Sequence, residues 1–360
     1  MGNHRDAPVY ELTAAKAPVT EYDVALLDLD GVVYTGQGAV QGAVQALARA
    51  RATGLRLAFV TNNASRSPSA VAAHLSRLGV PATSDDVVTS AQAAASVIAA
   101  RVPAGSPVLV AGAIGLRLAL RARGLRPVSV AKDNPAAVVV GYSPDMSYGL
   151  LAEAGLAVRA GALFVAANVD KTLPTPRGLQ PGNGSIVQVI ATATGIEPLV
   201  AGKPEPPLHH EAMRRTGAKR PLVVGDRLDT DIEGAARGDA DSMLVLTGVS
   251  TPQELVLAPP SQRPNYITAD LAGLLEPQPL VGVVRGSVGE RPDAMAGVTA
   301  VRYGGWTARW SPHGGSVFMD GGGEPVDGLR ALCAVSWLGK QVTAEMVEPA
   351  LRHLKYQPQG

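Results

Sequence analysis

Apolar, β-branched segments alternate with helical stretches along the first part of the chain. Val24–Asp28 and Arg56–Val60 have the composition of buried strands, whereas Val40–Arg51 and Ser69–Leu78 have that of helices. A glycine follows shortly after each helical stretch, which is a common signal for the end of a helix. Strands and helices that alternate in this way favour a parallel sheet covered by helices.

A second series of the same kind runs from about Ser90 to Glu197. Its expected strands are Pro107–Val110, Ala137–Tyr142 and Leu163–Ala167. Its expected helices are Leu116–Arg123, Tyr148–Arg159 and Ile186–Thr194. Between the last two helices, Asn168–Ser185 contains several prolines and glycines and is expected to be one long loop, of a length that often has a function. Two further buried strands are expected at Leu222–Gly225 and Ser242–Leu246.

The C-terminal part differs in character and is expected to begin near Pro277-Gln278-Pro279, beyond which lie all of the tryptophans. Val298–Arg302 and Trp306–Trp310 are expected to pair as a hairpin across a Gly-Gly turn. The other expected elements here are a strand at Ser316–Met319 and helices at Val326–Leu338 and Thr343–His353. Because proline interrupts regular structure, we expect few regular hydrogen bonds at the junction. The first 20 residues are expected to form an irregular lead.

Composition narrows the class of protein. The chain has 360 residues, enough for two or three domains, and its 32 basic and 31 acidic side chains nearly cancel, which gives no large positive field for nucleic-acid binding. Its start has no apolar signal-peptide region, and no apolar run approaches the roughly 20 residues that cross a bilayer. The single cysteine, Cys333, has no partner for an internal disulfide. We therefore expect a cytoplasmic protein that binds neither nucleic acid nor a membrane.

Two aspartates follow the first predicted strand, in the order Asp28-Leu29-Asp30-Gly31. Ligands of open α/β sheets bind where the strands end at their carboxyl edge. Carboxylates two residues apart on an extended segment face the same side, so one can attack or bind a metal while the other transfers a proton. Gly31 lets the backbone turn sharply behind the second aspartate. The alternative is a surface turn, in which aspartate and glycine are common.

Two further motifs offer groups that suit a phosphate. Thr61-Asn62-Asn63 follows the second strand, and its hydroxyl and amides could bind phosphoryl oxygens; a helix N-cap is the alternative. Gly202-Lys203-Pro204 precedes a helix, and a lysine offers a compact charge with three donors. A lysine is informative here because the chain has 25 arginines and only 7 lysines, although a solvent-exposed lysine in a turn is the alternative.

A cluster of aspartates follows the buried strand that ends at Gly225. Asp226, Asp229 and Asp231 lie within six residues of one another. Carboxylates suit Mg²⁺, which takes oxygen ligands, often one or two carboxylates together with substrate phosphate and water. In the alternative, this is an acidic turn whose later aspartates cap the next helix, and we expect one of the three to do only that.

In their order along the chain, these four motifs resemble the haloacid dehalogenase-like phosphatase superfamily. Its signature runs Asp-x-Asp-Gly, a Ser or Thr after a second strand, a Lys, and a Gly-Asp pair with a later Asp. The segments Val60–Ser67, Gly182–Ser185, Gly202–Pro206 and Gly225–Ile232 are similar to the subfamily of 4-nitrophenyl-phosphatase, phosphoglycolate, pyridoxal-phosphate and glycerol-phosphate phosphatases. The resemblance covers about residues 20–276.

This resemblance implies a magnesium-dependent phosphatase that forms an aspartyl-phosphate intermediate. Asp28 is then the nucleophile, and Asp30 is the general acid and base. The implied ligands of Mg²⁺ are Asp28, the Asp30 backbone carbonyl and Asp226, and Asp231 supports the waters of the metal. The residues implied to bind the phosphoryl oxygens are Thr61, Asn62, Asn63 and Lys203.

The resemblance also implies an α/β fold with a Rossmann-like parallel-sheet core and an inserted α/β cap domain, to which the elements expected after Pro279 add a small C-terminal α+β domain. The core would comprise residues 20–90 and 198–276, the cap 91–197 and the C-terminal domain 280–360. The cap shapes the substrate pocket in this family, so two cap residues are candidates for specificity. These are Asp170 and Ser143, where the subfamily often has an acidic residue.

The expected substrate is a small phosphorylated metabolite, with glycerol 3-phosphate and 2-phosphoglycolate as the leading candidates. A phosphotransferase or mutase of the same superfamily and a non-catalytic phosphate-binding regulatory protein are the alternatives. The C-terminal part resembles a fragment of an acetyltransferase-like fold but has no complete acyl-CoA phosphate loop. We expect it to have a binding, regulatory or dimerising role, and a homodimer would fit the last of these.

Overall fold

The structure is a computed structural model that describes residues 9–36, 38–175, 177–282, 298–311, 315–338 and 342–354. The chain divides into two units. Met1–Arg56 and Arg220–Gly360 form the first unit, and Leu57–Lys219 forms the second.

Four parallel strands form the central sheet of the first unit. In their order across the sheet they are β16 (Tyr266–Thr268), β15 (Asp241–Val245), β14 (Pro221–Gly225) and β2 (Val24–Leu27). Every residue of β2, β15 and β16 is buried, and β2 is a continuous apolar run in the sequence, as expected of a strand covered on both faces. The surrounding helices include α2 (Ala43–Ala52), α9 (Glu233–Arg237) and α10 (Pro252–Val256).

The second unit begins with a parallel strand pair, β5 (Arg56–Thr61) and β6 (Val87–Thr89). Helices α3 (Pro68–Arg77) and α8 (Pro206–Thr216) pack near β6. The first β-α-β-α series therefore matches the sequence-based expectation, with a short additional strand at β6 that was not expected.

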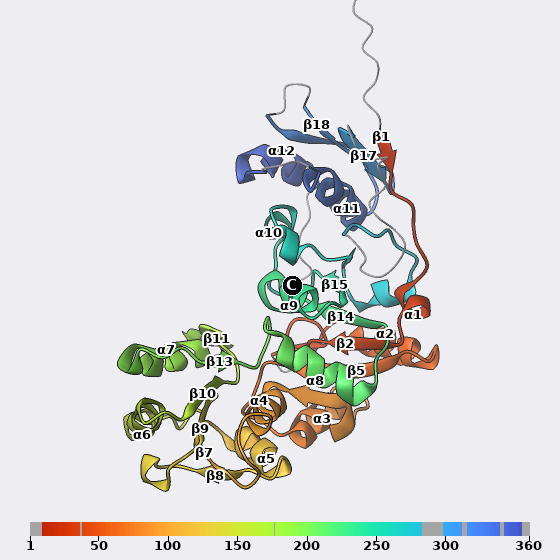
Figure 1. Ribbon diagram of the computed structural model, residues 1–360. Helices are drawn as coiled ribbons and strands as arrows, with labels where there is room; N and C mark the ends of the chain where they lie inside the picture. The colour runs from red at the N-terminus through yellow and green to blue at the C-terminus, as the bar shows by residue number, and fades with distance from the viewer. Residues whose placement is uncertain are drawn as a thin grey trace, which may run out of the picture. The chain divides into compact units, whose positions relative to one another are not determined.

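A second parallel sheet lies within the same unit. Its strands, in order, are β13 (Leu199–Val200), β10 (Leu163–Ala166), β9 (Ala137–Val140), β7 (Pro107–Ala111) and β8 (Arg126–Val128). Helices α6 (Tyr148–Arg159) and α7 (Asn183–Thr194) cover one face, and α4 (Ser90–Ala99) and α5 (Ile114–Ala122) lie on the other (Figure 1). This three-layer arrangement agrees with the inserted α/β domain expected from the sequence.

The segment expected to be one long loop is partly structured. Within Asn168–Ser185, β11 (Thr172–Thr175) and β12 (Gly178–Pro181) pair as an antiparallel ribbon, and α7 already begins at Asn183. The expectation of a single loop was therefore wrong. The ribbon could not be predicted from the sequence, because β12 is exposed at every residue and so lacks the alternation of apolar and polar residues that marks a half-buried strand.

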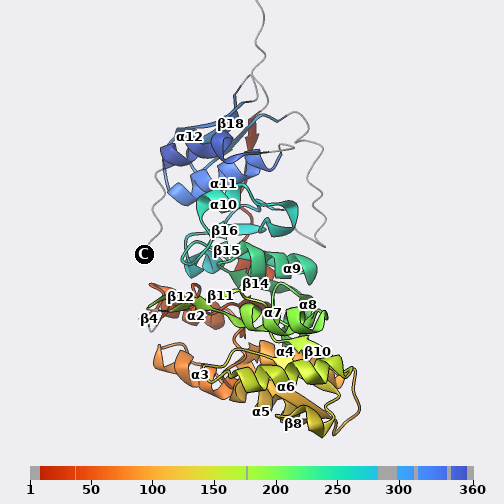
Figure 2. The same cartoon turned by 90° about the vertical axis from the view of Figure 1, so that its left-hand side faces the viewer.

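The C-terminal part forms a four-stranded sheet with two helices packed on it (Figures 1 and 2). Its strands, in order, are β1 (Val9–Glu11), β17 (Ala300–Tyr303), β18 (Trp306–Trp310) and β19 (Val317–Gly321); the helices are α11 (Pro325–Ser336) and α12 (Ala344–Leu354). The expected hairpin is confirmed, because Tyr303 pairs with Trp306 across Gly304 and Gly305, whose φ angles are 56° and 83°. The expectation of an irregular lead was wrong for β1, which pairs in parallel with β17.

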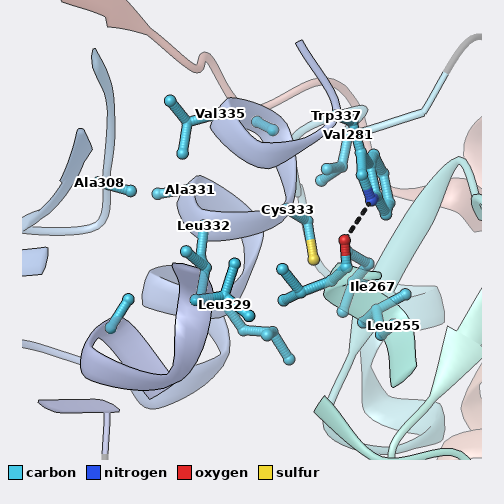
Figure 3. Close-up of a cluster of buried hydrophobic side chains, with 14 of the residues drawn as sticks. Leu255, Ile267, Val281, Ala308, Leu329, Ala331, Leu332, Cys333, Val335 and Trp337 are labelled. Atoms are coloured by element: carbon cyan, nitrogen blue, oxygen red, sulfur yellow. Dashed lines mark hydrogen bonds between the residues drawn. The ribbon is translucent and has the colours of Figure 1, made fainter. Parts of the chain in front are cut away.

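One hydrophobic cluster joins the C-terminal part to the central sheet of the first unit. Figure 3 shows Leu255 of α10 and Ile267 of β16 facing Leu329, Cys333 and other residues of α11. Burial raises the pKa of the Cys333 thiol well above its usual range, so this cysteine is a packing residue rather than a reactive one.

Polar contacts cross the same boundary, and they come from side chains rather than from regular backbone hydrogen bonds, of which the sequence predicts few. The buried guanidinium of Arg330 donates to the Ile267 carbonyl and to Gln278 Oε1, both at 2.8 Å. The indole N–H of Trp337 donates to the Val256 carbonyl at 3.2 Å (Figure 3). Gln278, flanked by the two prolines, is itself only 1% exposed. The proline-flanked junction is therefore part of the packed interior.

Replacing Trp337 by Ala should lower the free energy of unfolding by about 3–5 kcal/mol, the usual cost of removing a large buried aromatic side chain. Trp337, at the end of α11, is 3% exposed in this cluster, whereas Phe318 on β19 is 46% exposed and provides a matched control. Chemical denaturation of Trp337→Ala and Phe318→Ala would compare the two. Equal, small losses in both variants would show that the cluster does not stabilise the first unit.

Candidate active site

Three aspartates of the first unit form a compact acidic cluster. Each of Asp28, Asp226 and Asp231 offers a carboxylate oxygen, and these oxygens lie within 4.8 Å of one another. Asp28 directly follows β2, and its N–H donates to the Val224 carbonyl at 2.8 Å. Asp226 directly follows β14, so two neighbouring parallel strands deliver two of the carboxylates to the same edge.

Burial strengthens the repulsion between the carboxylates of this cluster, because little water surrounds them. Asp226 and Asp231 are each 1% exposed, and Asp28 is half-buried. Like charges this close disfavour one another, and a divalent cation relieves the repulsion. Mg²⁺ prefers carboxylate oxygens, so the residues present fit a magnesium ion.

Glycines make room for the carboxylates. Gly31 has a φ of +82°, and a Cβ there would lie 2.5 Å from Oδ2 of Asp226. A Cβ at Gly248 would also collide with the Asp226 carboxylate, and one at Gly225 would collide with Asp231. The sharp turn expected at Gly31 is thus accompanied by a second requirement, the close approach of a buried carboxylate.

The segment Thr247–Ser250, which follows β15, also supports the cluster. Val249 N–H donates to Asp226 Oδ2 at 2.7 Å, and Ser250 N–H donates to the Asp226 carbonyl at 3.1 Å. Thr247 Oγ1 donates to the Gly31 carbonyl at 2.5 Å. Sequence reasoning missed these residues, although the available signal was the same as elsewhere: a Thr-Gly pair directly after an apolar strand.

The remaining predicted residues of this group differ in exposure. Asp30 is exposed, whereas Leu29 beside it is 1% exposed, so solvent reaches the second aspartate of the motif. Asp231 lies in a π-helical turn, Leu228–Ile232, and its Oδ2 accepts from the Arg227 N–H at 3.2 Å. The carboxylate expected to support metal-bound water therefore belongs to the same cluster as the other two.

The second unit brings together Asn62 and Lys203. Oδ1 of Asn62 accepts from the Lys203 N–H at 2.8 Å, and Nδ2 donates to the Lys203 carbonyl at 3.2 Å. Lys203 is 3% exposed, and its ammonium donates to the Val60 carbonyl at 3.4 Å. A lysine this deeply buried is rarely a plain surface residue, so the alternative of a solvent-exposed turn lysine does not hold.

Thr61 and Asn63 flank Asn62 and have different surroundings. Thr61 is buried at the end of β5, and its Oγ1 accepts from the Asn63 N–H at 3.1 Å. The exposed Asn63 side chain accepts from both the N–H and the hydroxyl of Ser65, at 2.8 and 2.7 Å. Oδ1 of the Asn63 side chain thus stabilises a local turn, and the side-chain N–H₂ group is left for other contacts.

The two specificity candidates occupy different surroundings within the second unit. Asp170 Oδ2 accepts from Nδ2 of Asn62 at 3.2 Å, so the structure brings Asp170 to the Thr61–Asn63 segment. Ser143 lies in a turn after β9, where its hydroxyl accepts from the Asp145 N–H at 3.3 Å.

Comparisons with known families identify the class of protein. A haloacid dehalogenase-like hydrolase model matches residues 25–126, and a second HAD-hydrolase-like model matches residues 200–274. A GCN5-related N-acetyltransferase like domain model matches residues 303–354, in agreement with the resemblance noted for the C-terminal part.

Relatives of known activity extend this match. The chain is 52% identical over 268 residues to the D-glycerol 3-phosphate phosphatase of Mycobacterium tuberculosis, which covers 74% of this chain and 75% of that protein. It is 39% identical over 254 residues to an acid sugar phosphatase of Staphylococcus saprophyticus, covering 69% of this chain and 95% of the relative. This chain belongs to the haloacid dehalogenase-like hydrolase family.

Solved structures agree with the sequence match. A glycerol phosphate phosphatase from Mycobacterium tuberculosis in complex with magnesium superposes with a TM-score of 0.82 and 43% identity, over 95% of this chain and 99% of that one. A 4-nitrophenylphosphatase from Thermotoga maritima gives 0.66 and 30%, over 71% and 97%. The predicted superfamily, fold class and phosphatase class of enzyme are confirmed, and the magnesium-bound relative agrees with the predicted cofactor. Within the described part of the chain, no helix is long and apolar enough to cross a membrane.

Replacing Gly248 by Ala should weaken Mg²⁺ binding by about 10- to 100-fold, the usual effect of disturbing the groups that orient a metal ligand. The new Cβ would displace the Asp226 carboxylate. Gly155→Ala is the control, because a Cβ at that position meets no atom within 4 Å. Calorimetric titration with Mg²⁺ measures both variants, and an unchanged affinity in Gly248→Ala would contradict the assignment.

Proposed function

We propose that this protein hydrolyses glycerol 3-phosphate to glycerol and inorganic phosphate. The observation that carries the proposal is the 52% identity over 268 residues to a D-glycerol 3-phosphate phosphatase, together with the buried acidic cluster at Asp28, Asp226 and Asp231. Acid sugar phosphatases among the relatives support a small phosphorylated metabolite more generally.

In this proposal, Asp28 is the nucleophile. One of its carboxylate oxygens forms a bond to phosphorus as the bond between phosphorus and the ester oxygen breaks, and Asp30 gives its proton to the departing alkoxide. Asp30 then takes a proton from a water molecule that attacks the phosphorus of the aspartyl phosphate. Inorganic phosphate leaves and the Asp28 carboxylate is restored. The exposure of Asp30 supports this role, because its proton can exchange with solvent between turnovers.

Asp28, the Asp30 backbone carbonyl and Asp226 would hold Mg²⁺, with Asp231 beside them. When bound, the ion neutralises charge so that an anionic carboxylate can approach an anionic phosphate. Two observations support these ligands. A Cβ at Gly31, Gly225 or Gly248 would collide with the carboxylate of Asp226 or Asp231, and a bound cation would relieve the repulsion between the carboxylates.

Thr61, Asn62, Asn63 and Lys203 are proposed to bind the phosphoryl oxygens. The buried ammonium of Lys203 supports this role, because a cation that is largely removed from water gains most from an anionic ligand. Catalysis of phosphoryl transfer depends chiefly on this kind of positioning and charge neutralisation.

We also propose roles for the domains, a cellular location and an oligomeric state. Residues 20–90 and 198–276 would form the catalytic core, 91–197 a cap that selects the substrate, and 280–360 a domain without separate activity. A cytoplasmic location is supported by the single, buried cysteine. The homodimer remains a proposal that measurement of the molar mass in solution would test.

Asp28→Asn should reduce turnover to below about a hundredth of wild type, because roles of this kind supply several powers of ten in rate. The test measures phosphate release from glycerol 3-phosphate, 2-phosphoglycolate and other phosphate esters with Mg²⁺ and with excess chelator. We expect glycerol 3-phosphate to give the highest kcat/KM and the chelator to abolish release. A mutase would convert substrate without releasing phosphate, and that result would refute the proposal.

Asp170→Ala should change the ranking of substrates more than it changes hydrolysis of a generic aryl phosphate. The reason is that Asp170 contacts Asn62 at the edge of the proposed phosphoryl site rather than within the acidic cluster. Asp145→Ala, an exposed aspartate of the Ser143 turn, is the matched control. If kcat/KM for every ester falls by the same factor in Asp170→Ala, the residue is structural.

A further inference from the structure

Two buried asparagines connect three segments: the proposed phosphoryl-binding segment Thr61–Asn63, the segment that carries Asp170, and the start of α7. Asn168 and Asn183 are 5% and 2% exposed, and neither is used in the mechanism proposed above. Buried amides are costly unless they are hydrogen-bonded, so their partners define what they hold in place.

The side chain of Asn168 contacts two of these segments at once. Its Nδ2 donates to the Asn62 carbonyl at 2.7 Å, and its Oδ1 accepts from the Asp170 N–H at 3.2 Å. The donor end therefore fixes the backbone after β5, and the acceptor end fixes the backbone that carries Asp170.

The Asn62 carbonyl is fully engaged by this contact. Ser90 Oγ donates to the same oxygen at 2.6 Å, so both lone pairs are used. Because the peptide unit is planar, holding this carbonyl also holds the direction of the Asn63 N–H, which donates to Thr61 Oγ1. Asn168 therefore influences, through the Asn62–Asn63 peptide, the orientation of the Thr61 hydroxyl that is proposed to bind the phosphoryl group.

Asn183 and its neighbours hold Asn168 in turn. Nδ2 of Asn183 donates to the Asn168 carbonyl at 2.7 Å, from the start of α7. A Cβ at Gly184 would collide with the backbone of Val169, and one at Gly182 with that of Asp170. The Gly182–Ser185 motif therefore serves to let α7 approach the Asn168–Asp170 segment closely.

We propose that Asn168 is a positioning residue that keeps the Thr61–Asn63 segment and Asp170 in one productive geometry. It touches no reacting atom in this assignment and acts through the Asn62 peptide and the Asp170 backbone. The inference rests on the proposed function and deepens it, since it names a residue on which both phosphoryl binding and substrate choice depend.

Asn168→Asp is the decisive variant, because it keeps the shape and the acceptor but replaces the donor with a carboxylate oxygen that faces the Asn62 carbonyl. We expect kcat to fall about 10- to 100-fold at neutral pH on both glycerol 3-phosphate and an aryl phosphate. Burial raises the pKa of the new carboxyl, and its protonated form again offers a donor. The ratio of variant to wild-type kcat should therefore rise as the pH falls.

Asn265→Asp is the matched control for burying a carboxylate. Asn265 is also 5% exposed, and its Oδ1 accepts from the Ser242 N–H at 2.7 Å in the first unit. Its turnover per folded molecule should show no such pH-dependent recovery. A folded Asn168→Asp with the kcat of wild type at every pH, or with a loss that does not recover, would overturn the inference.

Ser90→Ala provides a second test if Asn168→Asp does not fold, because it removes the other donor to the Asn62 carbonyl without adding charge. We expect a several-fold loss of kcat, and an unchanged kcat would overturn the inference. Wild-type enzyme that releases phosphate while both variants behave normally contradicts only this inference. Wild-type enzyme that releases no phosphate would overturn the proposed function and this inference with it.

Discussion

The mutual repulsion of three clustered carboxylates, two of them buried, is the constraint on which the rest of the first unit depends. For two unit charges 4.8 Å apart and an effective dielectric constant near 20, the repulsion is about 3 kcal/mol. The fold opposes this repulsion with strand ends that fix the backbone, N–H groups of the Thr247–Ser250 segment, and glycines that admit no Cβ. A bound divalent cation would convert the repulsion into attraction, so metal binding and stability of this unit are linked.

Much of this arrangement could be predicted because it depends on local pattern. Asp28 and Asp226 each end an apolar run, and in a parallel sheet such residues meet at one edge. The Gly304-Gly305 turn was equally readable, since a two-residue hairpin of this type requires positive φ at both positions. The proposed roles of Thr61 and Lys203 still rest on the family resemblance, and their burial makes those roles physically reasonable.

What could not be predicted depends on contacts between segments far apart in the sequence. The pairing of β1 with β17 joins Val9 to Ala300, and a three-residue strand carries no periodic signal of its own. The asparagine at 168 looks like any loop residue until the fold brings Asn62 and Asn183 to its two ends. Arg330 is similar, because a charged residue on a helix is normally expected to face solvent.

The contacts of Arg330 suggest a structural role for the acetyltransferase-like part of this hydrolase. β16 is the last strand in the order of the parallel sheet, and a strand in that position presents backbone groups without a neighbouring strand. Arg330 donates to the carbonyl of Ile267 in this strand, and α11 places apolar side chains against the same residue (Figure 3). The C-terminal part therefore covers β16, the edge strand of the sheet whose inner strands β2 and β14 lead to Asp28 and Asp226. Such a role needs a packed helix and a small sheet, and it does not depend on an acyl-CoA site.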